Sequence, residues 1–315
     1  MMMLHTTALA MMMALGVSQG IKAQIFGPPF QRLPPRPNVS VAVDSVFPPL
    51  SSRPLLARRD ALLPSHRVIA FYGNPRSTRM GILGQIPPDR MMAQLEQTAA
   101  EWRQADSTMA VQPALHLIVT VAQADAGRDG MYRLRHGNAL IEQVAGWAES
   151  KGWLLFLDVQ VGRSTVAREL DWLIPWLRKP YVHLALDPEF AMPPDGFPGK
   201  RIGSLDAVDV NFAIDLLANL VDEERIPPKL LVVHRFTERM LTNHEAITLD
   251  PRVQVVLHMD GFGAPALKRS IYDYIVTRRP VQFAGLKLFY KNDRPLMTPA
   301  EILALRPIPV YIQYQ

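Results

Sequence analysis

Residues 152–190 read GWLLFLDVQVGRSTVARELDWLIPWLRKPYVHLALDPEF. Two short runs rich in apolar residues, 152–162 and 182–190, flank a stretch with helical spacing, Ser164–Leu177, which Pro180 brings to an end. A strand, a helix and a second strand in this order form a βαβ unit, and such units build parallel sheets. This segment therefore indicates an α/β fold.

The same alternation of apolar runs and helical patterns extends over residues 66–315. The predicted strands share a short apolar core and are VIAFYG (68–73), ALHLIVTVA (114–122), GWLLFLDVQVG (152–162), VHLALDPEF (182–190), KLLVVHRF (229–236), VQVVLHMDGFG (253–263), FAGLKLFYK (283–291) and IPVYIQYQ (308–315). Eight strands in about 250 residues is the usual size of a (β/α)₈ barrel. We therefore predict a single TIM barrel over residues 66–315.

Helical patterns separate these strands. They cover 89–104, 138–150, 164–177, 204–225, 264–277 and a short segment opened by the capping box Thr298-Pro-Ala-Glu301. An acid suited to the N-cap position, Asp89, opens the first of them. An open doubly wound sheet is the alternative arrangement, but its glycine-rich phosphate turn is missing after the first strand, where the chain reads Gly73-Asn-Pro-Arg.

The positive charge of the chain belongs to its N-terminal part. The formal net charge is +5, and residues 1–67 hold seven Lys or Arg and two Asp, so residues 68–315 are neutral. A nucleic acid is therefore not an expected partner of the barrel. The chain has no cysteine, which excludes disulfides, thiolate metal sites, a cysteine nucleophile and a lipid-modified cysteine.

The first residues match a secretory signal peptide. Residues 6–17, TTALAMMMALGV, form an apolar run that is too short to span a bilayer. We assign 1–23 to a signal peptide and the proline-rich stretch 24–65 to a linker or arm. The mature protein is therefore expected to be exported, to the periplasm, the extracellular space or the cell surface, without a transmembrane span.

Ionisable side chains gather at the carboxyl ends of the predicted strands, where barrel enzymes place their active sites. They are Asp158, Asp187, Glu189, His234, His258, Asp260 and Lys287. Buried charges are costly unless they are paired, so such groups are retained for function or in compensating networks. We expect these side chains to meet in one pocket.

A pair of carboxyl groups suits glycoside hydrolysis. We predict Glu189 as the general acid, because a neighbouring Asp187 carboxylate should raise its pKa, and Asp260 as the nucleophile or base. Asp158 and Asp187 would support them or bind sugar. The alternative for Asp187 is a structural one, as the cap of the turn after its strand.

Other side chains at these strand ends would orient the substrate. They are Gln160, His234, His258, Lys287, Tyr72, Asn74, Tyr290 and Gln313. The expected partner is a polysaccharide or cell-envelope glycan, and the reaction requires no cofactor and no metal ion. Three alternatives remain open: a cell-surface barrel that binds glycans without cleaving them, a divalent-metal-dependent hydrolase or isomerase that uses the acids and histidines as ligands, and a Schiff base on Lys287.

Several stretches resemble a family of uncharacterised exported bacterial proteins that are described as hypothetical proteins or lipoproteins with a glycoside-hydrolase-like (β/α)₈ barrel. The stretches that carry the resemblance are FYGNPRSTRMGILG (71–84), PALHLIVTVAQ (113–123), LLFLDVQVGRS (154–164), VHLALDPEFAM (182–192), PPKLLVVHRFTERMLTN (227–243) and HMDGFGAP (258–265). The resemblance implies the barrel fold and export, and no particular activity or catalytic residue. The absence of cysteine departs from a lipoprotein pattern.

Overall fold

The computed structural model of the protein describes residues 58–315. The predicted signal peptide, 1–23, and most of the predicted arm, 24–65, lie outside these residues. None of the helices within 58–315 is long and apolar enough to cross a membrane.

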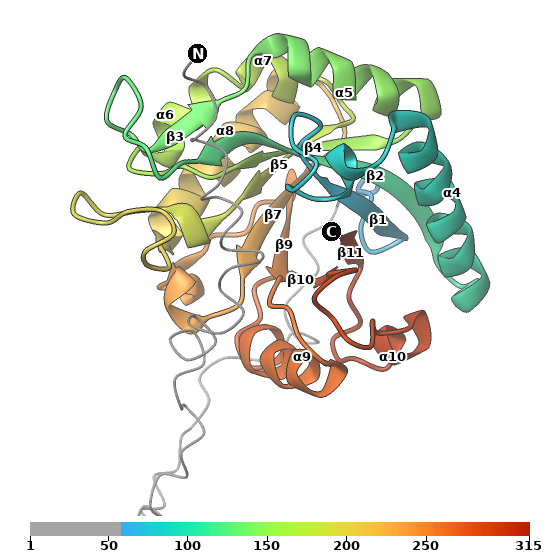
Figure 1. Ribbon diagram of the computed structural model, residues 1–315. Helices are drawn as coiled ribbons and strands as arrows, with labels where there is room; N and C mark the ends of the chain where they lie inside the picture. The colour runs from blue at the N-terminus through green and yellow to red at the C-terminus, as the bar shows by residue number, and fades with distance from the viewer. Residues whose placement is uncertain (1–57) are drawn as a thin grey trace, which may run out of the picture. The chain divides into compact units, whose positions relative to one another are not determined.

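Eight parallel strands close into a barrel, and the predicted (β/α)₈ fold is confirmed (Figure 1). The strands of the barrel are β1 (His66–Gly73), β2 (Ala110–Ala122), β4 (Leu154–Val159), β5 (Val182–Leu186), β7 (Lys229–Arg235), β9 (Val253–Met259), β10 (Phe283–Leu288) and β11 (Tyr311–Tyr314). Each strand pairs with its neighbour in chain order, and β1 pairs with both β2 and β11, which closes the ring. A short strand, β3 (Arg133–Arg135), adds to β2 in the antiparallel direction, and β6 (Leu205–Asp206) pairs with β8 (Leu241–Thr242) outside the barrel.

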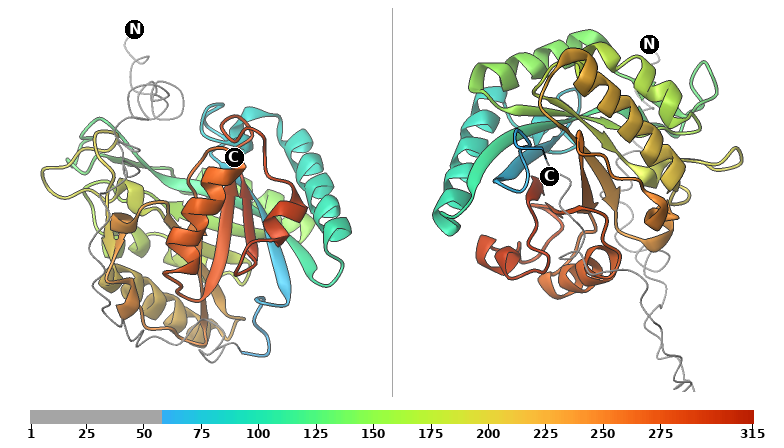
Figure 2. Two further views of the ribbon diagram at one scale, coloured as in Figure 1. Left: turned by 90° about the horizontal axis from the view of Figure 1, so that it is seen from below. Right: turned by 180° about the vertical axis from the view of Figure 1, so that it is seen from behind.

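Helices lie around the outside of this ring, as the views from below and behind also show (Figure 2). They are α3 (Ile82–Gln85), α4 (Pro88–Ala105), α5 (Asn138–Lys151), α6 (Val166–Asp171), α7 (Ile174–Leu177), α8 (Ala207–Glu224), α9 (Pro265–Tyr272) and α10 (Pro299–Leu303). The connection from β7 to β9 holds the two 3₁₀ turns Glu238–Met240 and His244–Ala246 and the short strand β8, and no α-helix.

The helix boundaries differ from the sequence prediction in two places. The predicted helix 164–177 is split into α6 and α7, because Pro175 lacks an N–H donor and stands near the start of a new helix. Asp89 lies in the first turn of α4 and is not its N-cap, a position that Pro87 occupies. The capping box at Thr298 is present, with hydrogen bonds in both directions between Thr298 and Glu301.

Alternation along the strands divides the core into two parts. Side chains such as Leu157 and Leu184 pack outward against the helices, where Trp102 is fully buried. Side chains such as Phe156, Val232 and Val256 pack together as a separate cluster. The inward positions above this cluster, toward the carboxyl ends of the strands, carry the polar residues.

The floor of the barrel is closed by residues that precede β1. Leu63 is 1% exposed and packs with the inner apolar cluster. Its backbone N–H donates to Gln254 Oε1 at 3.0 Å, and its carbonyl accepts from Gln254 Nε2 at 2.7 Å. The end of the stretch assigned to the arm is therefore part of the packed barrel.

A buried ion pair anchors the loops after β9 and β10. Lys268 Nζ lies 3.0 Å from Asp293 Oδ2, and both side chains have no exposed surface. The same ammonium donates to the carbonyls of Gly261 and Lys287 at 2.8 and 2.7 Å. Asp293 accepts from the backbone of Gly263, so this pair fixes the backbone on both sides of the barrel mouth.

Lys268→Met is expected to lower the free energy of unfolding by about 3–5 kcal/mol, because it leaves the Asp293 carboxylate buried without its partner. Urea denaturation followed by circular dichroism measures the change. Arg269→Ala is the matched control on the same helix, since its pair with Glu301 is half exposed, and it should cost about 1 kcal/mol or less. Equal effects of the two substitutions would contradict a structural role for the buried pair.

Candidate active site

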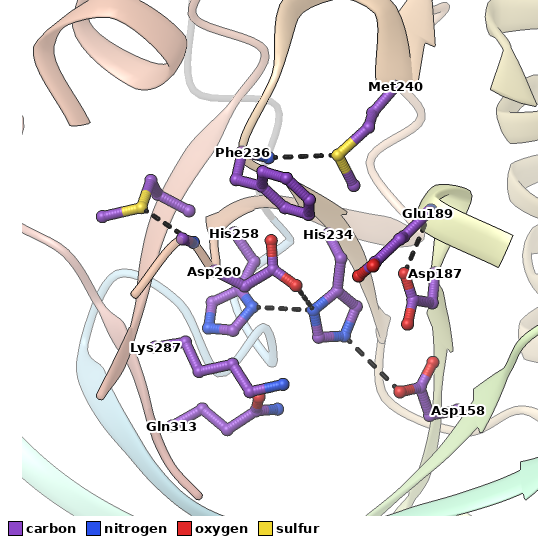
Figure 3. A network of polar contacts seen from close by, with 12 residues as sticks. Asp158, Asp187, Glu189, His234, Phe236, Met240, His258, Asp260, Lys287 and Gln313 are labelled. Atoms are coloured by element: carbon purple, nitrogen blue, oxygen red, sulfur yellow. Dashed lines mark hydrogen bonds and ion pairs between the residues drawn. The ribbon is translucent and has the colours of Figure 1, made fainter. Parts of the chain in front are cut away.

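The mouth of the barrel brings together the ionisable residues that the sequence placed at the strand ends. Figure 3 shows these side chains converging from β4, β7, β9, β10 and β11 and from the loops after β5 and β9. The residues drawn together are Asp158, Asp187, Glu189, His234, His258, Asp260, Lys287 and Gln313. Asp187, Asp260 and Lys287 retain 4%, 8% and 4% exposure, and Glu189 is partly exposed. The other four side chains are fully buried.

His234 lies at the centre of this cluster, between two carboxylates. Its Nδ1 is 3.1 Å from Asp260 Oδ2, and its Nε2 is 3.6 Å from Asp158 Oδ2. His258 approaches from β9, with its Nδ1 at 3.2 Å from His234 Nδ1. The next residue, Arg235, donates to backbone carbonyls of the following loop, as expected from the alternation of a strand.

The His258 ring occupies space that a glycine on the neighbouring strand leaves open. A Cβ atom at Gly285 of β10 would lie 2.7 Å from His258 Cδ2 and 3.0 Å from a methyl group of Val256. Such contacts are shorter than van der Waals distance, so a larger residue at Gly285 would displace the imidazole. The position of His258 therefore depends on a residue from the next strand.

His116 was not among the predicted site residues, yet it belongs to the cluster. It is fully buried in β2, and its Nε2 lies 3.4 Å from Asp158 Oδ2. Its Nδ1 contacts the Tyr311 hydroxyl at 2.6 Å and the side-chain amide of Gln313 at 2.9 Å. The sequence signal was a polar residue at an inward position of an otherwise apolar strand, four residues before the predicted strand-end residue Thr120.

Asp158 is held in its charged form. Burial alone would raise its pKa, but the neighbouring His234 and His116 outweigh burial and lower the pKa to about 2. For His116, burial is the dominant effect and lowers its pKa to about 4, in spite of the nearby Asp158. The mouth thus contains a carboxylate and a neutral imidazole in close contact at neutral pH.

Asp187 has the capping role that the sequence left as an alternative, and it also has a side-chain partner. Its side chain accepts from the backbone N–H of Glu189 at 3.2 Å, at the start of the 3₁₀ turn Pro188–Phe190. Its other oxygen accepts from Gln160 Nε2 at 3.1 Å. The strand itself ends at Leu186, so Glu189 reaches the mouth from a turn and not from a continuing strand.

Glu189 is the acid with the clearest functional setting. Burial and then the charge of Asp260 raise its pKa to about 8, although Lys287 acts in the opposite direction. The causes of this elevation are burial and Asp260, while the repulsion between Glu189 and Asp187 raises the pKa of Asp187. Burial also raises the pKa of Asp187, and the charges of Asp158 and Glu189 raise it further.

Lys287 places a positive charge near the acids without contacting them directly. Its ammonium lies over the Tyr72 ring, 3.5 Å from the centroid, and forms no ion pair within 4.0 Å in residues 58–315. Burial lowers its pKa, while Asp260 and Asp187 raise it. Lys287 and Asp260 therefore interact across a gap rather than through a direct ion pair.

Two predicted site residues lie elsewhere. Asn74 is buried in the turn after β1, where it donates to the carbonyl of Ile118 and accepts from the backbone of Arg76. Tyr290 is 38% exposed and stacks on Tyr314, 5.4 Å between centroids. The structure does not bring either residue into contact with the acids of the mouth.

Three side chains have the composition of a metal-binding set. One ligand atom each from His116, Asp158 and His234 lies within 4.8 Å of the others. Two imidazoles and a carboxylate suit zinc and other first-row transition metals.

No protein-family model matches this sequence, and neither does any curated protein. Among solved structures, the chain is similar to a ruminal GH26 endo-β-1,4-mannanase, with 10% identity and a TM-score of 0.41. The match covers 85% of this chain and 65% of the mannanase chain. The barrel fold is assigned from the pairing of the strands in this chain and not from this similarity.

Glu189 is expected to make the folded state less stable as the pH rises. The unfolded chain releases this proton near the ordinary pKa of 4.5, whereas the folded barrel retains it up to about pH 8. Between these values the folded state binds more protons, so the free energy of unfolding falls with increasing pH. Asp158 acts in the opposite sense, because its pKa is lowered in the folded state. It stabilises the folded state above pH 3.8, and this contribution is lost as the pH falls towards 2.

Glu189→Gln removes the ionisation and should therefore gain stability over the wild type between about pH 5 and about pH 9, as measured by urea denaturation across that range. Glu142→Gln, at an exposed position of α5, is the control and should follow the wild type at every pH. A constant difference between Glu189→Gln and the wild type would show that Glu189 keeps its ordinary pKa.

Proposed function

We propose that this protein is a glycoside hydrolase that acts on a polysaccharide or a cell-envelope glycan. The observation that carries the proposal is a pair of carboxyl groups in contrasting settings at one mouth. Glu189, after β5, is held in its protonated form, and Asp260, after β9, is bound by His234. A single strand, β7, separates the two strands that carry them.

The two settings match the two roles that glycosidic cleavage requires. Glu189 would donate its proton to the leaving oxygen as the bond to the anomeric carbon breaks. Asp260 would attack that carbon or remove a proton from the water that does so. The bond from His234 engages only Asp260 Oδ2, and Oδ1 has no hydrogen-bond partner within the described residues, which leaves an oxygen for this step.

The remaining polar residues of the mouth would stabilise charge and bind hydroxyl groups. Lys287 offers an ammonium without an ion pair in residues 58–315, and Gln160 holds Asp187 in place. Tyr72 provides an aromatic ring at the inner wall. A sugar ring needs such a mixture of donors, acceptors and flat apolar faces.

A cavity beside the mouth offers room for a longer ligand. It has a volume of about 380 Å³ and is lined by residues that follow β4 and β5, among them Val161, Ala191 and Met192. Because these loops leave the same end of the barrel as Glu189, a chain of sugars bound at the mouth would extend toward this cavity. The apolar run at 6–17 is the basis for placing this activity outside the cytoplasm.

Glu189→Gln should lower the rate of glycan hydrolysis by about 10²–10⁴-fold with the fold intact, because general acid catalysis is lost. A screen of purified polysaccharides and cell-envelope glycans, followed by product analysis, identifies the substrate and measures the rates. The wild-type rate should fall as the pH rises through about 8, where Glu189 loses its proton.

Asp260→Asn tests the second carboxylate, and the anomeric form of the first product distinguishes its role. Retention of configuration assigns Asp260 as the nucleophile and inversion assigns it as the base. Undiminished hydrolysis by Glu189→Gln would refute the assigned acid. Binding of a glycan by the wild type without any cleavage would favour the non-catalytic glycan-binding barrel.

A further inference from the structure

Beneath the pair of carboxyl groups lies a set of polar atoms that the glycosidase reaction does not use. His116 Nε2, His234 Nε2 and both oxygens of Asp158 are buried and have no hydrogen-bond partner within the described residues. All three side chains have no exposed surface. Buried polar atoms without partners are costly, so their convergence on one point needs an explanation.

The contacts of His234 indicate which of its nitrogens carries a proton. A carboxylate only accepts hydrogen bonds, so Nδ1, at 3.1 Å from Asp260 Oδ2, is the protonated nitrogen. The alternative, in which His258 donates to His234 Nδ1, would place a lone pair against that same carboxylate. With Nδ1 facing Asp260, Nε2 of the same ring faces Asp158 Oδ2 at 3.6 Å.

Gln313 can accept a hydrogen bond from Nδ1 of His116, as Asp260 does from Nδ1 of His234. The amide nitrogen of Gln313 lies 2.9 Å from His116 Nδ1, while its oxygen is buried without a partner in residues 58–315. Exchanging the amide oxygen and nitrogen, which have nearly the same shape, lets Oε1 accept from Nδ1–H. In this arrangement His116 Nε2, which lies 3.4 Å from Asp158 Oδ2, is free to bind a cation.

Two imidazole nitrogens and a carboxylate oxygen thus converge on one buried point, as the ligands of a cation do. From these contacts we infer that His116, Asp158 and His234 bind a first-row transition-metal ion, with Zn²⁺ as the closest match to the ligand set. Bonds of about 2.0–2.2 Å in a tetrahedral site place ligand atoms about 3.3–3.6 Å apart, and the two contacts to Asp158 Oδ2 have this length. The ligand atoms of the three side chains lie within 4.8 Å of one another, so the imidazole rings would move closer together when the ion binds.

The groups behind the ligands have the arrangement that metal-binding histidines require. Such a histidine donates its other ring N–H to a carboxylate or another acceptor, which fixes the tautomer and the ring orientation. Asp260 contacts His234 Nδ1 in this way, and Gln313 and Tyr311 contact His116 Nδ1. The ion would join β2, β4 and β7 and would leave a coordination position for water.

Zinc content and zinc affinity of the full chain test this inference. The protein is produced without a histidine tag, stripped with a chelator, and titrated with ZnCl₂ by calorimetry, and the protein as purified is analysed for metals. We expect one equivalent of zinc in the wild type and a rise in the melting temperature on zinc addition. His116→Gln and Asp158→Asn should lose this binding, and Asp260→Asn should weaken it by about 10–100-fold.

His183→Gln is the matched control, because His183 is a buried histidine of β5 that bonds the backbone N–H of Leu230 outside the triad. It should bind zinc as the wild type does. Absence of stoichiometric zinc, manganese, iron and nickel binding by the folded wild type would overturn the inference, as would ¹⁵N NMR that shows His234 as an imidazolium. Metal content is measured without a glycan, so failure of hydrolysis and failure of metal binding are separate results.

Discussion

The placement of His234 between Asp158 and Asp260 determines the charge balance of the whole mouth. Two carboxylates that face the same imidazole inside a closed barrel would repel each other strongly in a medium of low polarity. The imidazole bonds one of them and approaches the other, and the ammonium of Lys287 acts on both across the cavity. Glu189 and Asp187 have no contact with this imidazole, and burial raises the pKa of both.

Most of the fold follows from the sequence because a parallel barrel has a strong local signal. Strands such as β7, buried on both faces, appear as continuous apolar runs, and the helices between them have clear ends. The deviations arise where local chemistry competes with the pattern. Pro175 divides one predicted helix, and Asp187 ends β5 by capping a turn within a stretch that looks extended in sequence.

The candidate site was only partly predictable, for a geometric reason. A search of strand ends finds Asp260 and Glu189, which lie at the rim, but overlooks His116, which lies deeper in β2. The depth of a side chain in the barrel depends on the register between neighbouring strands, which one strand alone does not reveal. In this barrel, the register pairs His116 with Tyr72 on one side and with Phe156 on the other. The ring orientations of aromatic residues outside the mouth, such as Tyr290, likewise depend on helix packing that the alternation of a strand does not encode.

Leu63 closes the floor of the barrel and therefore belongs to the unit that folds. The autonomous domain begins before its first strand, since removal of this residue would leave the amide of Gln254 without partners beneath the inner apolar cluster. Water would then enter the narrow end of the barrel. A fragment that keeps the stable barrel must therefore include Leu63.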